Sequence, residues 1–147
     1  MDTLSAPRSL IWIGIGLIGL TGLIHLIEAP EYFELATYLG IAFVLNALGA
    51  ALAAYGIYQG RSWGWTLGIV VAGGAFVAYI VSRTAGLPGL AETEFFETSG
   101  IFSLLVEGLF TGLAGYILSR VSRFSRGSTA SSSTDGTGEK SASASSR

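Results

Sequence analysis

Four polar residues of this 147-residue chain are placed where they could do chemistry, because each lies within or beside a long apolar stretch. His25 is near the end of the first stretch, and Glu28 follows one turn later, so both would share one face of a helix. Arg83 directly follows the third stretch, and Glu107 lies inside the fourth, about 10 Å from its start. An imidazole, two carboxylates and a guanidinium can together bind a small ligand or hold a proton.

Three interpretations of these polar residues stay open. In the first, the Arg83 side chain reaches inward and pairs with Glu107, which only ties the third apolar stretch to the fourth. In the second, all four residues build one ligand or proton site. In the third, His25 and Glu28 hold a divalent metal together with Glu31, as a weak set of one nitrogen and two carboxylate ligands.

The composition excludes several classes of activity. The chain has no cysteine, which excludes disulfides, thiolate metal sites, c-type haem attachment and thiol redox chemistry. Its one histidine excludes haem ligation by two histidines within a single chain. There is no phosphate-binding glycine loop, no two-histidine metal motif and no spaced Ser, His and Asp set, which argues against an enzyme and implies no particular cofactor. The net charge of −2 is unlike that of a nucleic-acid-binding domain.

The elements that must position these residues are four apolar stretches, at residues 10–27, 35–58, 63–82 and 100–118. Glu107 is the one Asp, Glu, Lys or Arg within them, and half of the whole chain is hydrophobic. Each stretch is close to the ~20 residues that a helix needs to cross about 30 Å of hydrocarbon. The sequence therefore predicts an all-α, multi-pass protein of the cell membrane, folded over residues 10–118 as an antiparallel four-helix bundle.

Charges predict the orientation of this bundle. Residues 1–9, the connection 59–62 and residues 119–147 hold every basic residue except Arg83, whereas the connections 28–34 and 83–99 hold six glutamates. Short segments rich in arginine stay in the cytoplasm, so we expect both termini there and the polar cluster on the outer side. Trp12, Trp63 and Trp65 would form an aromatic belt at the cytoplasmic interface.

The ends of the spans carry further signals. Pro30 is expected to end the first helix and to begin the second, and residues 92–98 are expected to form a short interfacial helix. Residues 119–147 are rich in Ser, Thr, Gly and Ala and are expected to form a disordered cytoplasmic tail.

Small and polar residues within the spans predict close helix packing. Asn46, in the middle of the second span, is expected to hydrogen-bond to another helix. Three G-x-x-x-G pairs are expected to serve packing inside the bundle more than contacts between copies: Gly56 with Gly60, Gly64 with Gly68, and Gly108 with Gly112.

Two segments carry a resemblance to known proteins. HLIEAPEYFE at residues 25–34 and SRTAGLPG at residues 82–89 resemble elements of a group of small four-span membrane proteins of archaea and bacteria. The resemblance covers residues 10–118 and implies a four-span fold in which the histidine, the acidic proline motif, the SRT-x-GLP element and the glutamate of the fourth span recur together. The matching residues are His25, Glu28, Pro30, Glu31, Arg83, Pro88 and Glu107. The group has no assigned activity, so the resemblance implies no reaction.

Three functional hypotheses follow. The first is a structural or partner-organising bundle, whose partners are the lipid bilayer and either a second copy or another membrane protein. The second is a membrane module that binds a metal or a small ligand, such as a quinone-like head group, in the outer polar cluster. The third is a subunit of an oligomeric transporter in which Glu107 carries protons or selects ions. The sequence alone favours the first, because signatures of catalysis and transport are missing.

The topology is directly testable, because the natural chain has no cysteine. A cysteine introduced at Glu31 is expected to react with a membrane-impermeant maleimide added to intact cells. A cysteine introduced at Ser62 is expected to react only after the cells are opened. The reverse pattern would contradict the predicted orientation and place the polar cluster at the cytoplasmic end.

Overall fold

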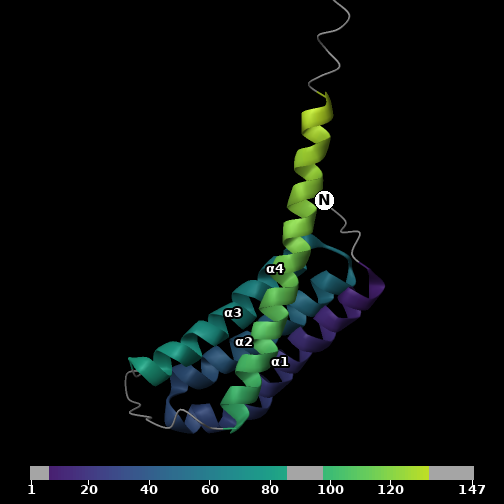
Figure 1. The fold of residues 1–147 in the computed structure, drawn as a ribbon. Helices are drawn as coiled ribbons and strands as arrows, with labels where there is room; N and C mark the ends of the chain where they lie inside the picture. Colours follow the sequence, from purple (N-terminus) through teal and green to yellow (C-terminus); the bar gives the residue numbers. More distant parts are fainter. Residues whose placement is uncertain (1–6, 86–97, 133–147) are drawn as a thin grey trace, which may run out of the picture.

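The computed structural model describes residues 7–85 and 98–132, and within these ranges the chain is all-helical, as the sequence predicted. The four helices are α1 (Arg8–Leu35), α2 (Thr37–Tyr58), α3 (Ser62–Thr84) and α4 (Thr98–Ser132). Each helix packs against the next one in sequence, and α4 returns to pack against α1, so the four form a closed bundle (Figure 1). The residues predicted to form a short interfacial helix lie mostly outside the described ranges.

Very short connections hold the first three helices antiparallel. Ala36 alone separates α1 from α2, and its extended backbone, with φ −162° and ψ 131°, ends the first helix. Between α2 and α3 the chain reverses over residues 59–61, where Gly60 has a φ of +70°. That left-handed conformation strains an L side chain and suits glycine.

The predicted boundary at Pro30 is wrong, because α1 continues through Pro30 to Leu35. Proline inside a helix removes one backbone hydrogen bond and its ring crowds the carbonyl of residue i−4, yet a helix can continue past it when later contacts favour the helical path. Here the extra turn places the Tyr32 ring on the Phe43 ring of α2, with centroids 3.8 Å apart. A tertiary contact therefore overrides the local signal.

The helix α4 continues beyond the predicted fourth span. The sequence predicted this span over residues 100–118, and the part of α4 that is long and apolar enough to cross a membrane is Gly100–Arg120, while the helix itself runs to Ser132. Extending an existing helix costs far less than starting one, and the residues after 118 include alanine and arginine, which suit a helix. In Figure 1 this part of α4 projects beyond the other three helices. The remaining residues of the predicted tail, 133–147, lie outside the described residues.

Close packing fills the half of the bundle that contains the α2–α3 turn. Trp65 is buried here and stacks on Phe110 of α4, so it does not belong to the predicted interfacial belt. Gly14 of α1 leaves room for its indole, since a Cβ there would overlap the Cη2 atom of the ring. Ile18 and Ile57 complete this side of the core, and both are fully buried.

The glycine pairs divide into two kinds. Gly64 of α3 lies against the backbone of Gly56 in α2, and Gly68 lies against the Phe110 ring, so these glycines serve packing inside the bundle. By contrast, Gly108 and Gly112 have nothing within 4 Å of a built Cβ. The expectation of internal packing therefore holds for Gly56, Gly64 and Gly68, whereas Gly60 serves the turn and has nothing within 4 Å of a built Cβ. It is wrong for Gly108 and Gly112.

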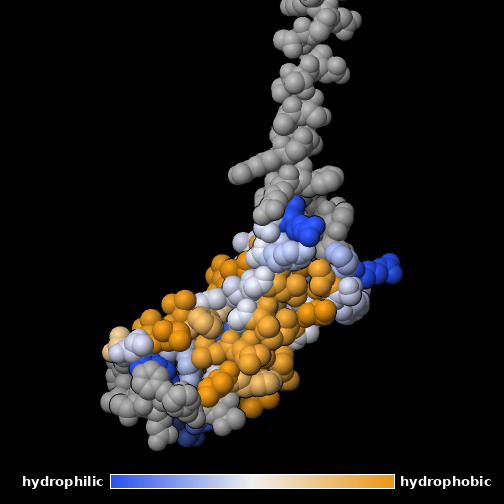
Figure 2. Space-filling model, viewed as in Figure 1, coloured by the Kyte–Doolittle hydropathy of each residue, from blue (hydrophilic) through white to orange (hydrophobic). Residues whose placement is uncertain are grey.

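The outer surface is apolar along the helices. All four helices, α4 over Gly100–Arg120, are long and apolar enough to cross a membrane. Large side chains such as Leu45, Leu52 and Val70 are more than half exposed. Figure 2 shows hydrophobic residues over the flank of the bundle and strongly hydrophilic ones near its two ends. Such a surface is compatible with an integral membrane protein.

The α2–α3 contact predicts which glycine the fold requires. In Gly64→Ala the new methyl group would lie 2.8 Å from the Gly56 Cα, so we expect the free energy of unfolding to fall by about 1–3 kcal/mol. Gly19→Ala is the control, because nothing lies within 4 Å of its built Cβ, and alanine favours helix by up to about 1 kcal/mol. Unfolding of both variants in a detergent titration checks this. Equal stability of Gly64→Ala and the natural chain would contradict the close approach.

Candidate functional site

A cavity of about 300 Å³ lies among all four helices, in the half of the bundle opposite the α2–α3 turn. Here α1 ends, α2 begins, α3 ends and α4 begins, so the packing of Trp65 and Phe110 does not extend to this level. All four polar residues singled out from the sequence line the cavity: His25, Glu28, Arg83 and Glu107. The structure therefore gathers at one site residues that are up to 82 positions apart.

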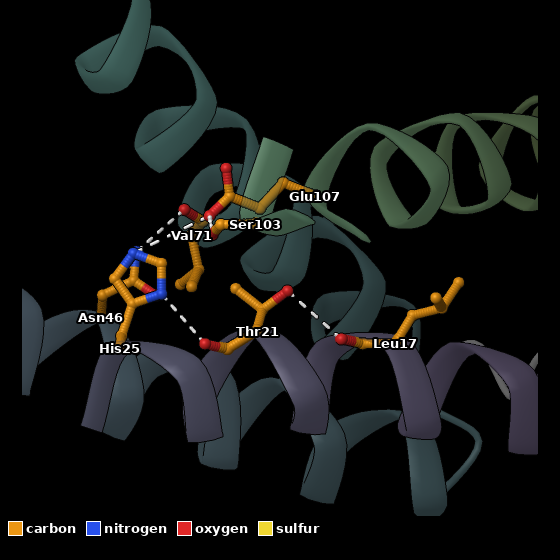
Figure 3. Close-up of polar contacts among 7 residues, drawn as sticks. All are labelled: Leu17, Thr21, His25, Asn46, Val71, Ser103 and Glu107. Carbon is orange, nitrogen blue, oxygen red and sulfur yellow. Dashed lines mark hydrogen bonds and ion pairs between the residues drawn. The ribbon is translucent and has the colours of Figure 1, made fainter. Parts of the chain in front are cut away.

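His25 and Glu107 approach each other across the interface of α1 and α4 (Figure 3). The imidazole Nε2 lies 3.8 Å from Oε1 of the carboxyl group. His25 is only 7% exposed and Glu107 only 2%. A carboxyl group buried in a bundle with an apolar surface needs partners within the protein.

Helical spacing orients the His25 ring. Its Nδ1 lies 2.9 Å from the backbone carbonyl of Thr21, one turn earlier in α1. Because a carbonyl only accepts, Nδ1 carries the proton of this hydrogen bond. The Nε2 atom is therefore the one turned to Glu107, and in a neutral ring it is a hydrogen-bond acceptor.

Helical spacing also orients Glu107. The Ser103 hydroxyl, one turn earlier in α4, donates to Oε1 of Glu107 at 2.9 Å. This partner was not singled out from the sequence, although its spacing of four residues before a buried glutamate is a signal that could have identified it.

The separation of His25 from Glu107 has a chemical consequence. At 3.8 Å the two atoms are beyond normal hydrogen-bonding distance, so a third polar group can bridge them. The pair can hold one proton on either partner, and it can thus present one donor and one acceptor to a bound molecule. Both groups line the cavity, which brings this pair within reach of a ligand.

Asn46 lines the same cavity from α2. Its Nδ2 donates to the backbone carbonyl of Val71 in α3 at 3.2 Å, which is the kind of interhelical bond expected from the sequence. Because a carbonyl accepts, this bond fixes which end of the amide is the nitrogen. The opposite atom, Oδ1, is buried and has no hydrogen-bond partner among the described residues.

Aromatic rings form two walls of the cavity. On one wall Phe43 of α2 contacts both the Tyr32 ring and the His25 ring, with centroid distances of 3.8 and 4.9 Å. On the other wall the guanidinium carbon of Arg83 lies 5.2 Å from the centroid of the Tyr79 ring. Arg83 is only 8% exposed, so its charge is held beside the cavity rather than in open solvent. Phe43 and Tyr79 were not singled out from the sequence, since aromatic residues are common in membrane spans.

Two groupings considered from the sequence are the ion pair of Arg83 with Glu107 and a metal site that includes Glu31. The Glu107 carboxyl contacts Ser103 and His25, and its pairing with Arg83 stays a prediction. For a metal, no group of three His, Cys, Asp or Glu side chains with suitable geometry occurs within residues 7–85 and 98–132. Glu31 is exposed and does not line the cavity, so it is not brought together with His25 and Glu28.

No protein-family model, curated protein or solved structure matches this chain.

The contact between His25 and Glu107 predicts energetic coupling. In a double-mutant cycle of His25→Gln and Glu107→Gln, we expect the unfolding free energies to depart from additivity by about 0.5–3 kcal/mol, because the two side chains face each other in a buried site. Thr66→Ala combined with Glu107→Gln is the control, since Thr66 is exposed and bonds only within α3. Additivity in both cycles would show that His25 and Glu107 do not interact.

Proposed function

We propose that this chain is an integral membrane protein that binds a small organic ligand in the cavity among its four helices. The observation that carries the proposal is a cavity among apolar helices that is lined by the buried polar side chains of His25 and Glu107 and by the buried Asn46 Oδ1, which has no hydrogen-bond partner among the described residues. Ligand sites combine mostly apolar walls with a few converging polar groups. This cavity has both features.

The size of the cavity limits the ligand. About 300 Å³ is at the lower end of the range of small-molecule sites. It corresponds to the volume of roughly ten water molecules in the liquid. The site therefore suits one ring or a head group of comparable size.

The packing of the bundle favours binding over a purely structural role. Where α2 and α3 meet near their turn, glycines allow backbone contact, and Trp65 and Phe110 fill the interior. The same chain thus packs densely in one half and leaves a cavity in the other, at the level of its buried polar residues. A bundle that served only as a scaffold has no need of that difference.

The same packing favours binding over conduction through a single chain. Ile18, Trp65 and Phe110 are buried with at most 1% exposure and occupy the centre of the bundle beyond Glu107. A solute in the cavity would meet this core. A transporter built from several copies and a partner membrane protein stay predictions from the sequence.

In the orientation proposed from the charges, both termini lie in the cytoplasm and the cavity lies near the outer face of the cell membrane. This placement is supported by the position of Arg8 and Arg61 at the opposite end of the bundle from Glu28 and Arg83.

Phenol is a suitable probe of the proposal, since it has one ring and one hydroxyl group. We expect phenol to raise the melting temperature of the detergent-solubilised protein, because a ligand that binds only the folded state stabilises it. In Ala75→Leu, which places a larger side chain on the cavity wall, this shift should be lost. The control is Ala51→Leu on α2, an exposed position that does not line the cavity, where the shift should remain.

Equal shifts in both variants would mean that phenol acts elsewhere and would contradict binding in the cavity. No shift in the natural protein at concentrations up to the solubility of phenol would contradict the proposed function itself.

A further inference from the structure

The exposed part of the cavity wall lies at one edge only. Among the lining residues, His25, Arg83, Ser103 and Glu107 are buried, whereas Ala42 of α2 and Gly74 and Ala78 of α3 are exposed. All three exposed residues have small side chains or none. They mark where the cavity reaches the surface of the protein.

This edge lies between α2 and α3. On α2, Phe43 contacts rings of α1, so it lies on the side of the cavity wall next to α1. Ala42 lies on the other side of the same wall, which is turned toward α3. On α3 the Tyr79 ring lies against Gly100 of α4, so Ala78 lies on the edge turned away from α4 and toward α2. Below this level the bond from Asn46 to Val71 holds α2 and α3 together.

The opening is inside the apolar part of both helices. Ala42 is the sixth residue of α2, and Ala78 comes six residues before the end of α3. At about 1.5 Å per residue, both lie roughly 8–9 Å from the helix ends. Both helices qualify as membrane spans over their length, so the opening faces lipid rather than water.

The polar atoms of the cavity define what a head group must supply. Asn46 Oδ1 is a buried acceptor without a donor among the described residues, and a neutral His25 presents Nε2 as a second acceptor. A hydroxyl group satisfies an acceptor of this kind, whereas an ether or a hydrocarbon does not. Leaving such an acceptor unpaired beneath a bound molecule is unfavourable.

We infer that the ligand enters from the bilayer between α2 and α3 and is a lipid-soluble phenol or hydroquinone, whose hydroxyl-bearing ring occupies the cavity while its apolar tail extends through the opening at Ala42, Gly74 and Ala78. This inference rests on the proposed function. The ring suits the aromatic wall of Tyr32 and Phe43, and the cavity of about 300 Å³ is too small to hold a long tail as well.

The head group is tested with two probes that differ only in the donor. In nanodiscs of phosphatidylcholine, we expect tritiated 4-decylphenol to bind the natural protein about tenfold more tightly than 4-decylanisole, in which a methyl group replaces the hydroxyl hydrogen. The comparison needs no altered protein. Asn46→Leu should reduce the preference for the phenol, because it removes the Oδ1 acceptor that has no donor among the described residues. Equal binding of the two probes to the natural protein would overturn the assignment of a hydroxyl head group.

The route is tested with neighbouring substitutions on α3. Ala78→Phe should weaken or slow 4-decylphenol binding about tenfold by filling the opening, whereas Val77→Phe should leave it unchanged, because Val77 is exposed and does not line the cavity. Equal binding to both variants would overturn the lateral route.

Comparing phenol with 4-decylphenol distinguishes failure of the proposed ligand-binding function from failure of the proposed lipid-soluble ligand class. If phenol binds in the cavity but 4-decylphenol binds no more tightly than phenol, the ligand-binding function stands and the lipid-soluble class is wrong. If neither probe binds the natural protein, both proposals fail.

Discussion

The constraint on which this structure depends is the burial of the Glu107 carboxyl group among helices that have an apolar surface. A bilayer offers no water to satisfy such a group, so its partners must come from the protein. Ser103 supplies one hydrogen bond from the same helix, and His25 approaches from α1. The His25 ring is in turn oriented by the Thr21 carbonyl. The polar centre of the bundle therefore lies where Glu107, Ser103 and His25 meet.

Much of the fold could be predicted from the sequence, because uninterrupted apolar stretches of about the length of a membrane span predict helices. The four helices occur where the apolar stretches predicted them, and the polar residues chosen for their apolar surroundings meet at one cavity. The errors have a common origin in tertiary contacts. Pro30 is a valid local stop signal, yet the stacking of Tyr32 on Phe43 accompanies another turn of helix. Trp65 resembles a residue of an interfacial belt, but Gly14 leaves a space that its indole fills.

The partners of the polar residues were harder to predict than their positions. A long arginine side chain near a buried glutamate suggests an ion pair, and spacing along separate helices cannot show which neighbour comes closest. The approach of His25 to Glu107 depends on the rotation of α1 and α4 about their axes, which packing along their whole length determines. The positions of Phe43 and Tyr79 on the two aromatic walls have the same origin, since no pattern separates these aromatic residues from those on the outer surface.

Small residues have opposite effects at the two ends of the α2–α3 pair. At one end they allow the two helices to touch, and at the other they border the opening of the cavity. Gly64 meets the backbone of Gly56, so the two helices touch and no space remains. Ala42 and Ala78 border a cavity lined by polar groups, where an apolar side chain long enough to close the gap would bury His25 and Asn46 against hydrocarbon. Filling the opening with an apolar side chain would add a few packing contacts but would leave the Asn46 Oδ1 acceptor without a donor. The same physical rule, that buried polar atoms require partners, separates the two halves of the bundle. Polar side chains are scarce in the dense half, whereas in the open half the proposed ligand would supply the partner that Asn46 Oδ1 lacks among the described residues.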